Sequence, residues 1–260
     1  MNRERLDKLL VDRGLLPTRA RAADAVRRGL VRVDGAIVRK PGQKVSADCR
    51  LDVEETATRY VSRAALKLRA ALETWPMSMQ GRIVLDLGAS TGGFTQVLLM
   101  AGAARVYAVD VGHGQLHPDL AADPRVVSLE GVNVRDLSTV LIPEAPDVIT
   151  ADLSFISLSK ALPAALTLAA PGARLYALIK PQFEAGRERL GKGGIVRDPA
   201  VHQAVIAKIR DFLENEAGWS VLGVAPSPLP GREGNREFLI AADKPLNDGK
   251  NEQVRKRPLR

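Results

Sequence analysis

The segment from Val84 to Phe94 constrains the fold of this chain more than any other stretch. An apolar, strand-like run carries one acid at Asp86, a glycine turn follows at Gly88, and helix-forming residues resume at Phe94. An open α/β sheet forms its ligand-binding crevice in this way, at the carboxyl end of its first strand. The segment therefore predicts an α/β fold with a ligand site at the end of this strand.

The same loop departs from the glycine pattern that binds phosphate groups. Ser90 stands where a second glycine would let the backbone approach a pyrophosphate, and the carboxylate of Asp86 would repel phosphate and attract a cation. S-adenosylmethionine has an ammonium and a sulfonium group and no phosphate, so the loop favours this cofactor over NAD. Asp110 ends the next predicted strand about 20 residues past the turn, where an acid can bind ribose hydroxyls. A tight turn that binds no ligand is the alternative.

Composition excludes several classes of protein. The chain of 260 residues is 45% hydrophobic, which is ordinary for a folded protein with a sizeable core. Its single cysteine, Cys49, excludes an internal disulfide and a cysteine-based zinc site. We find neither a signal peptide nor an apolar run long enough to span a bilayer, because prolines, a glycine and Arg174 interrupt the richest apolar stretch, 161–179. These features predict a soluble, cytoplasmic protein.

Positive charge is concentrated at the amino-terminal end. Residues 1–50 hold 13 Lys/Arg against 6 Asp/Glu, while the whole chain has a net charge of +8. Lysine and arginine gathered in one segment are typical of a protein that binds a polyphosphate partner. A solvated, charged surface without a partner is the alternative that charge alone leaves open.

This basic segment predicts two short helices followed by a hairpin. Leucines at helical spacing from Leu6 onwards stop at Gly14, a natural helix end. Thr18 can cap a second helix, which carries several arginines and ends at Gly29. Apolar alternation on both sides of Asp34-Gly35 is a strong signal for a β-hairpin.

This order of elements closely resembles the S4 RNA-binding domain over roughly residues 4–53. The matching motifs are Arg5-Leu6-Asp7, Arg19-Ala20-Arg21 and Val31-Arg32-Val33-Asp34-Gly35. In that family the arginine-rich second helix and the following hairpin bind RNA, so the resemblance implies an RNA partner. The implied RNA-binding residues are Arg5, Arg19, Arg21, Arg27, Arg28, Arg32 and Lys40.

Beyond residue 82 the sequence alternates between strands and helices. That order predicts a parallel sheet covered by helices on both faces. The predicted strands are Ile83–Leu87, Arg105–Asp110, Val126–Leu129, Pro146–Asp152, Arg174–Lys180, Ser220–Ala225 and Glu237–Ala241. The predicted helices are Gly93–Met100, Leu158–Leu168 and Ala200–Glu214.

Polar residues end three of these strands, where open α/β sheets bind ligands: Asp110, Asp152 and Lys180. Lys180 favours a functional role, because a lysine that ends an apolar strand and precedes a proline lies near the crevice. Asp152 alone could equally cap a helix. From its local sequence alone, Lys67 is expected to be a solvated lysine on a helix. Glu237 is likewise expected to be an exposed residue of a strand.

A second resemblance covers the rest of the chain. Lys67, Asp152, Lys180 and Glu237 fall where FtsJ-like ribose 2′-O-methyltransferases have a Lys-Asp-Lys-Glu tetrad, and the loop 86–94 matches that superfamily. With the S4-like domain in front, the chain resembles the TlyA family, bacterial rRNA cytidine 2′-O-methyltransferases that are also called haemolysins. The matches run from about residue 4 to residue 242.

The resemblance implies a Rossmann-like, seven-stranded methyltransferase sheet with a small amino-terminal α/β RNA-binding domain. It implies the RNA-binding domain at 1–58, a linker at 59–62, the methyltransferase domain at 63–242 and a basic, disordered tail at 243–260. No metal is expected, since a glycine and a proline beside His113 and His117 argue against a helix that holds both. The residues expected around S-adenosylmethionine are Asp86, Gly88, Ser90, Gly92, Gly93, Phe94 and Asp110, with Asn133 and Val134 near the adenine.

The implied reaction is methylation of a ribose 2′-hydroxyl in ribosomal RNA of the small subunit, the large subunit or both. Lys180 would act on the hydroxyl either as a base, made neutral by the ammonium of Lys67, or as a cation that stabilises the oxyanion. Asp152 and Glu237 would orient the reacting groups. The alternatives are a base methyltransferase, a non-catalytic RNA-binding factor and a membrane-lytic haemolysin, and no amphipathic or spanning segment supports the last.

Overall fold

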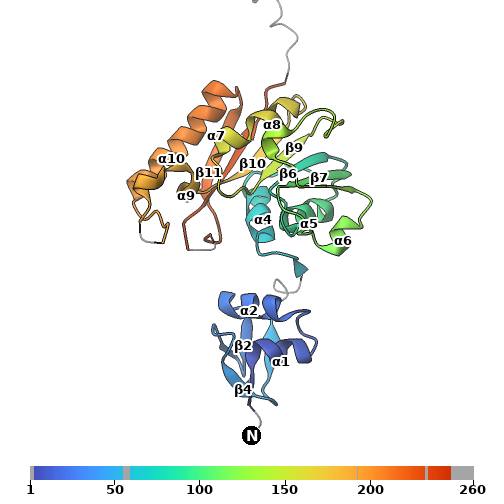
Figure 1. Ribbon diagram of the computed structural model, residues 1–260, viewed down its shortest axis with the longest axis vertical. Coiled ribbons are helices and arrows are strands. Elements are labelled where there is room, and N and C mark those ends of the chain that lie inside the picture. Colours follow the sequence, from blue (N-terminus) through green and yellow to red (C-terminus); the bar gives the residue numbers. More distant parts are fainter. Residues whose placement is uncertain (1–2, 55–58, 192, 232–233, 247–260) are drawn as a thin grey trace, which may run out of the picture. The chain divides into compact units, whose positions relative to one another are not determined.

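The computed structural model describes residues 3–54, 59–191, 193–231 and 234–246 (Figure 1). The chain divides into two compact units, Met1–Arg63 and Ala64–Arg260. We call them the amino-terminal unit and the carboxy-terminal unit. Most of the predicted tail, from residue 247 onwards, lies outside the described residues. Asp243, the predicted first residue of the tail, is the last residue of a strand, which therefore ends two residues beyond the predicted Ala241.

Among its described residues, the amino-terminal unit has two helices and two small sheets. The elements are β1 (Arg3–Arg5), α1 (Leu6–Asp12), α2 (Arg19–Arg28), β2 (Val31–Val33), β3 (Ala36–Ile37), β4 (Lys44–Ser46) and β5 (Leu51–Val53). β1 pairs with β4, and β2 pairs with both β3 and β5, all antiparallel. The helices and the hairpin agree with the prediction. The prediction lacks β1, β4 and β5, because strands of three residues show little alternation and no Asp-Gly turn marks these three.

Turn chemistry sets the ends of α2 and the shape of the hairpin. The Oγ1 atom of Thr18 accepts a hydrogen bond from the backbone N–H of Arg21, and Gly29 ends the helix with a left-handed φ of 77°. Asp34 and Gly35 both have positive φ, as a type I′ hairpin turn requires. Apolar side chains between the helices and β2 form the core, among them Leu6, Leu10, Ala22, Val26 and Val31.

A seven-stranded sheet forms the centre of the carboxy-terminal unit (Figure 1). Its strand order is β11-β12-β10-β9-β6-β7-β8. The strands are β6 (Ile83–Leu87), β7 (Arg105–Asp110), β8 (Val126–Glu130), β9 (Val148–Ala151), β10 (Arg174–Ile179), β11 (Ser220–Pro226) and β12 (Phe238–Asp243). The neighbours from β8 to β10 are parallel, whereas β12 is antiparallel to β10 and β11. The predicted parallel sheet is therefore wrong for β12. Residues 227–237, which join β11 to β12, are too few for a parallel crossover with a helix.

Helices cover both faces of this sheet, as the alternating side chains of β10 show. Ala177 and Ile179 belong to the core packed against α7, α8 and α10. Tyr176 and Leu178, which alternate with them, line a small gap against α4 and α5. The helices are α4 (Ala65–Thr74), α5 (Gly93–Met100), α6 (Pro118–Ala121), α7 (Leu158–Ala161), α8 (Pro163–Leu168), α9 (Pro181–Glu184) and α10 (Pro199–Asp211).

Element ends follow the sequence closely near the glycine loop and less closely elsewhere. β6, β7 and α5 begin and end at the predicted residues. The predicted helix 158–168 is two helices, because Pro163 lacks a backbone N–H and takes the first position of α8. α10 ends before the predicted Glu214 and continues into a π-helical turn, Phe212–Glu216.

The register of β10 and β12 determines which residues meet at the edge of the sheet. Arg174 lies opposite Asp243, and their side chains form a two-bonded ion pair at 2.6 and 2.8 Å. At the other end Ile179 lies opposite Phe238. The residue after Ile179 and the residue before Phe238 therefore lie side by side where the two strands end.

Replacing Thr18 with alanine removes the side chain that caps α2, so we expect the amino-terminal unit to lose about 1 kcal/mol of unfolding free energy. Hydrogen exchange of the α2 amides measures this loss, since both tryptophans, Trp75 and Trp219, lie in the other unit. Thr18→Ser keeps the hydroxyl and should exchange like the wild type. Equal protection in the alanine and serine variants would show that the cap does not stabilise the helix.

Candidate active site

Four charged side chains form two ion pairs at one edge of the seven-stranded sheet. Lys180 follows β10 and Asp152 follows β9, which is parallel to it. Glu237 precedes β12, and because that strand is antiparallel its first residue lies at the same edge. Lys67 belongs to α4. The structure thus brings together the four residues that the sequence analysis singles out as a tetrad.

Two polar partners hold Lys180 at the end of β10. Its Nζ atom lies 2.6 Å from Oδ1 of Asp152 and donates a hydrogen bond of 3.1 Å to Oγ of Ser154. The side chains of the ion pair are only 9% and 15% exposed. A pair so little exposed is weakly screened by salt and solvent, so its charges act strongly on any group that approaches.

Lys67 and Glu237 form the second ion pair. The Nζ atom of Lys67 lies 2.5 Å from Oε2 of Glu237, and their side chains are 7% and 3% exposed. The prediction that both residues are exposed, made from each position alone, is therefore wrong. A Cβ atom on Gly231 would lie 2.5 Å from Oε1 of Glu237, so the glycine leaves room for this carboxylate.

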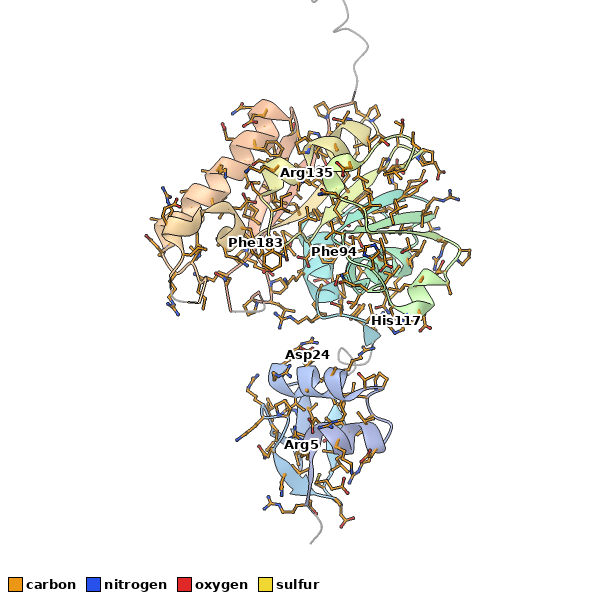
Figure 2. All side chains as sticks on the ribbon, viewed as in Figure 1. Arg5, Asp24, Phe94, His117, Arg135 and Phe183 are labelled. Atoms are coloured by element: carbon orange, nitrogen blue, oxygen red, sulfur yellow. The ribbon has the colours of Figure 1, made fainter. Side chains whose placement is uncertain are left out.

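The loop after β6 approaches this edge closely because its backbone is left-handed at three positions. Gly88, Ser90 and Gly92 have φ values of 79°, 47° and 92°. A Cβ atom on Gly88 would lie 2.8 Å from the backbone oxygen of Asp152, a contact that real side chains do not make. The glycine therefore lets the loop lie against the residue that pairs with Lys180. Gly93 begins α5, and the ring of Phe94 is buried (Figure 2).

Asp110 joins the loop after β6 to the loop after β7. Its Oδ2 atom accepts the backbone N–H of Ser90 at 2.9 Å, and its Oδ1 atom accepts that of Gly112 at 2.8 Å. A carboxylate oxygen can accept more than one hydrogen bond. Asp110 is half-buried, so it keeps the capacity to accept hydroxyl donors.

Glu130, the last residue of β8, is an organising residue that the sequence analysis missed. Its carboxylate accepts backbone N–H groups of Gly114, Gln115 and Leu116 at 2.8, 2.7 and 3.1 Å. These hydrogen bonds, that of Gln115 first, lower the pKa of Glu130. The loop that it holds also reaches Ser90, whose Oγ lies 3.2 Å from Oε1 of Gln115. The available signal was an acid at the end of a third parallel strand.

Asp86 lies beneath the loop rather than on its surface. It is fully buried, and its two oxygens accept hydrogen bonds from the hydroxyls of Thr95 and Thr150 at 2.6 and 2.8 Å. Burial raises the pKa of Asp86 to about 6. The carboxylate thus connects β6 with α5 and β9, and direct contact with a cofactor cation stays a prediction.

The two residues predicted near the adenine follow β8 at the same edge of the sheet. Asn133 begins a 3-10 turn, Val134–Asp136, and its Oδ1 atom accepts the backbone N–H of Arg135 at 3.0 Å. The side chain of Val134 is buried in the core. A ligand there would therefore meet the backbone of Val134 rather than its side chain.

The loop between β9 and α7 carries residues to which the sequence analysis gives no role. Phe155 has a φ of 65° and is 90% exposed. Its ring centroid lies 5.0 Å from that of Phe183. Phe183 belongs to α9 and is labelled in Figure 2. The buried carboxylate of Glu184 accepts the backbone N–H of Leu158 at 2.7 Å and the hydroxyl of Ser157 at 2.6 Å. Glu184 therefore anchors this loop to α9, the helix that follows Lys180.

The predicted RNA-binding residues lie in the amino-terminal unit. Arg5 and Arg19 converge on the carboxylate of Asp7. Arg21 donates a hydrogen bond to the backbone oxygen of Tyr60, so part of its guanidinium is engaged within the unit. The remaining predicted residues are exposed or half-buried: Arg27, Arg28, Arg32 and Lys40.

The two neighbouring histidines have separate surroundings. The Nδ1 atom of His117 accepts the backbone N–H of Asp119 at 3.3 Å and caps α6 (Figure 2). The ring of His113 lies over Gly131. Among the described residues, no group of three or more His, Cys, Asp or Glu side chains could hold a metal ion. In the same part of the chain, no helix is long and apolar enough to cross a membrane.

Comparison with known proteins places both units in families. The FtsJ-like methyltransferase family matches residues 60–244, and the S4 domain matches residues 4–48. A 16S/23S rRNA (cytidine-2′-O)-methyltransferase TlyA from Mycobacterium tuberculosis is 47% identical, over 92% of this chain and 89% of that protein. The chain belongs to the TlyA family of FtsJ-like methyltransferases.

Two further relatives extend this similarity. Hemolysin A of Brachyspira hyodysenteriae is 39% identical to the chain, over 90% of this chain and 98% of that protein. A solved structure of a protein described as a hemolysin from Streptococcus thermophilus is 43% identical and has a TM-score of 0.73. That similarity covers 95% of this chain and 92% of the other. The predicted Rossmann-like, seven-stranded sheet with an S4 domain before it is confirmed.

S-adenosylmethionine is the methyl donor of this family, and the residues at the sheet edge fit it. At Gly88 there is no room for a side chain beside Asp152, so the backbone of the loop itself lies at the strand ends. Asp110 ends β7 and Asn133 follows the neighbouring β8, so both can offer acceptors, for ribose and adenine respectively. We propose that these residues, with Ser90, Gly92, Gly93 and Phe94, hold the cofactor.

Asp110→Ala should weaken binding of S-adenosylmethionine by about 1–3 kcal/mol, because the ribose hydroxyls lose their acceptor and the loop at Ser90 loses an anchor. Isothermal titration calorimetry measures the affinity. Asp136→Ala, which removes an exposed acid of the same unit, is the matched control and should bind normally. Unchanged affinity in Asp110→Ala would remove Asp110 from the cofactor site.

Asp86 should make stability depend on pH with a definite sign. Its pKa in the folded chain, about 6, is above that of an unfolded aspartate. The contribution of Asp86 to the unfolding free energy is therefore largest below about pH 4 and is lost as the pH rises from about 4 to about 6. Asp86→Asn removes this dependence. From pH 4.5 to 7.5, the unfolding free energy of the variant should therefore rise relative to the wild type by about 2 kcal/mol. Urea unfolding followed by tryptophan fluorescence measures the difference, and a difference that is constant with pH would contradict the assignment.

Proposed function

We propose that this chain transfers a methyl group from S-adenosylmethionine to the ribose 2′-hydroxyl of a cytidine in ribosomal RNA. The observation that carries the proposal is the pairing of Lys180 with Asp152 and of Lys67 with Glu237 beside the glycine loop. The name of the Mycobacterium tuberculosis relative gives that protein's target as cytidine in 16S and 23S rRNA, which supports the same class of substrate. RNA of the small subunit, the large subunit or both is the proposed target.

A ribose hydroxyl is a poor nucleophile until its proton leaves or its developing negative charge is stabilised. S-adenosylmethionine, when bound, supplies a methyl group already activated on a sulfonium. The work left to the side chains is to align the hydroxyl oxygen with that methyl group and to manage one proton. Buried, fixed charges perform this work best, because they need not reorganise during the reaction.

Lys180 is the residue proposed to act on the hydroxyl, as a base or as a cation. A base would have to take the hydroxyl proton itself, whereas a cation would only stabilise the oxygen. Lys180 lies 2.6 Å from Asp152, and Lys67 lies 2.5 Å from Glu237, so each lysine is held as the cationic half of an ion pair. We therefore propose the electrostatic role. Lys180 stabilises the negative charge that develops on the hydroxyl oxygen while the hydroxyl proton moves to water.

Phe155 supplies a surface on which a base could stack. Phe155 is exposed and directly follows Ser154, in the loop that begins at Asp152. Aromatic side chains that stack with unpaired bases are a common means of RNA recognition. Phe183 supports the ring from α9, and Glu184 fixes the loop behind it. A base held there would bring its ribose close to Lys180.

The amino-terminal unit is proposed to dock the RNA. It contains the match to the S4 domain, and residues 1–50 carry 13 Lys/Arg against 6 Asp/Glu. Positive charge of this density attracts phosphate groups without regard to base sequence. We propose that this unit supplies affinity, while the sheet edge of the carboxy-terminal unit supplies the chemistry.

Lys180→Ala should reduce methyl transfer by about 10²–10⁴-fold and leave the affinity for S-adenosylmethionine near that of the wild type. The reason is that Lys180 acts on the hydroxyl rather than on the cofactor loop. Incorporation of labelled methyl groups into unmodified ribosomal RNA measures transfer, and calorimetry measures binding. Lys160→Ala, at an exposed lysine on α7, is the matched control and should be fully active. Lys67→Ala and Asp152→Ala should lose activity as Lys180→Ala does, and Glu237→Ala less.

The products of the same assay separate the alternatives. Near-normal incorporation by Lys180→Ala would contradict the role proposed for the two ion pairs. Label on a base rather than on a ribose, found after digestion to nucleosides, would identify a base methyltransferase. A wild-type chain that binds the cofactor and RNA but transfers no methyl group would be a non-catalytic RNA-binding factor.

A further inference from the structure

The amino-terminal unit buries one acid among its exposed arginines. The side chain of Asp7 is only 7% exposed, while those of Arg5 and Arg19 are 52% and 59% exposed. Asp7 lies in the first turn of α1, Arg5 ends β1, and Arg19 begins α2. One carboxylate thus connects basic side chains from separate elements of this unit.

The geometry holds Arg5 from two directions. Its Nε and Nη2 atoms donate hydrogen bonds of 3.0 and 2.9 Å to Oδ1 and Oδ2 of Asp7, which is the two-bonded arrangement that a guanidinium and a carboxylate prefer. A Cβ atom on Gly42 would lie 3.3 Å from Cζ, Nη1 and Nη2 of Arg5 alike. Three equal distances mean that the guanidinium lies flat over Gly42. The two hydrogen bonds to Asp7 and the contact with Gly42 together orient the guanidinium plane of Arg5.

Arg19 completes the cluster from the start of α2. Its Nη2 atom donates a hydrogen bond of 3.3 Å to Oδ2, the same oxygen that Nη2 of Arg5 contacts. The two guanidiniums are therefore neighbours, although like charges repel. A guanidinium has five N–H groups, so the carboxylate uses only part of what Arg5 and Arg19 can donate. The remaining N–H groups belong to side chains that are more than half exposed.

We propose that Asp7 is a positioning residue, which holds Arg5 and Arg19 side by side as a binding site for one backbone phosphate of RNA. The inference deepens the proposed RNA-docking function of the amino-terminal unit and rests on it. Long basic side chains lose rotational freedom when they bind a phosphate, and a carboxylate that orders them beforehand removes part of that loss. The hydrogen bonds from Arg5 hold the pKa of Asp7 at about 2, so the arrangement persists throughout the physiological pH range.

This role opposes what charge alone predicts. Asp7→Asn raises the net charge of the chain by one, so simple attraction between charges predicts tighter binding to RNA. Loss of positioning predicts weaker binding instead. The sign of the change therefore separates the two explanations. Asp48→Asn, at an exposed acid of the same unit, makes the same change in charge and is the matched control.

The test is binding of the full-length chain to purified 16S and 23S ribosomal RNA, measured by filter binding over a range of salt concentrations. We expect Asp7→Asn to bind about tenfold more weakly than the wild type, with a slope of log K against log salt that is smaller by about one phosphate contact. Asp48→Asn should bind as tightly as the wild type or more so. Binding by Asp7→Asn that equals or exceeds that of the wild type would overturn the inference.

A double-mutant cycle excludes a merely structural effect of Asp7. In a chain that already carries Arg5→Gln and Arg19→Gln, Asp7→Asn should weaken RNA binding no further, because the side chains that it positions are gone. Equal weakening in both backgrounds would mean that Asp7 supports the fold instead, and would overturn the inference. Hydrogen exchange of the α2 amides reports the folded state of each variant. Failure of the wild-type chain to bind either RNA would overturn the RNA-docking function as well.

Discussion

The antiparallel pairing of β12 with β10 is the constraint on which the candidate active site depends. If β12 were parallel, Glu237 would lie at the opposite edge of the sheet, about 20 Å from Lys180 for strands of this length. The two-bonded pair of Arg174 and Asp243 fixes the register at the far end of the strands. The same register then presents Lys180 and Glu237 side by side at the near end.

Burial makes these charges useful and also makes their pairing obligatory. A buried carboxylate or ammonium without a partner costs several kcal/mol, so neither Lys67 nor Glu237 could be buried at this edge alone. Each lysine has a carboxylate of its own, at 2.5 and 2.6 Å. β9 and β10, which precede Asp152 and Lys180, are buried along nearly their whole length, which limits the movement of that pair. Fixed charges of this kind suit a reaction in which the side chains must align a hydroxyl with an activated methyl group.

Local sequence patterns predict the frame of this site and not its burial. β6 and α5 have the predicted ends, because an apolar run, a glycine turn and a helix-forming segment follow one another directly along the chain. Lys67 and Glu237 are 170 residues apart. No local sequence pattern predicts that α4 contacts β12. Only the resemblance to a family links them before the structure is known. Local patterns also do not show the direction of a strand within a sheet, so the sequence predicts β12 as one more parallel strand.

The acids of this chain differ in what they bind, and residue type alone does not reveal it. Asp152 and Glu237 contact ammonium groups, whereas Asp110 and Glu130 contact backbone N–H groups. A carboxylate of the first kind fixes a charge, and one of the second kind fixes a loop. An amide in its place could still accept from a backbone N–H group but could not balance an ammonium. Spacing along the sequence places all four acids at strand ends, whereas the tertiary contacts decide which of them govern charge and which govern shape.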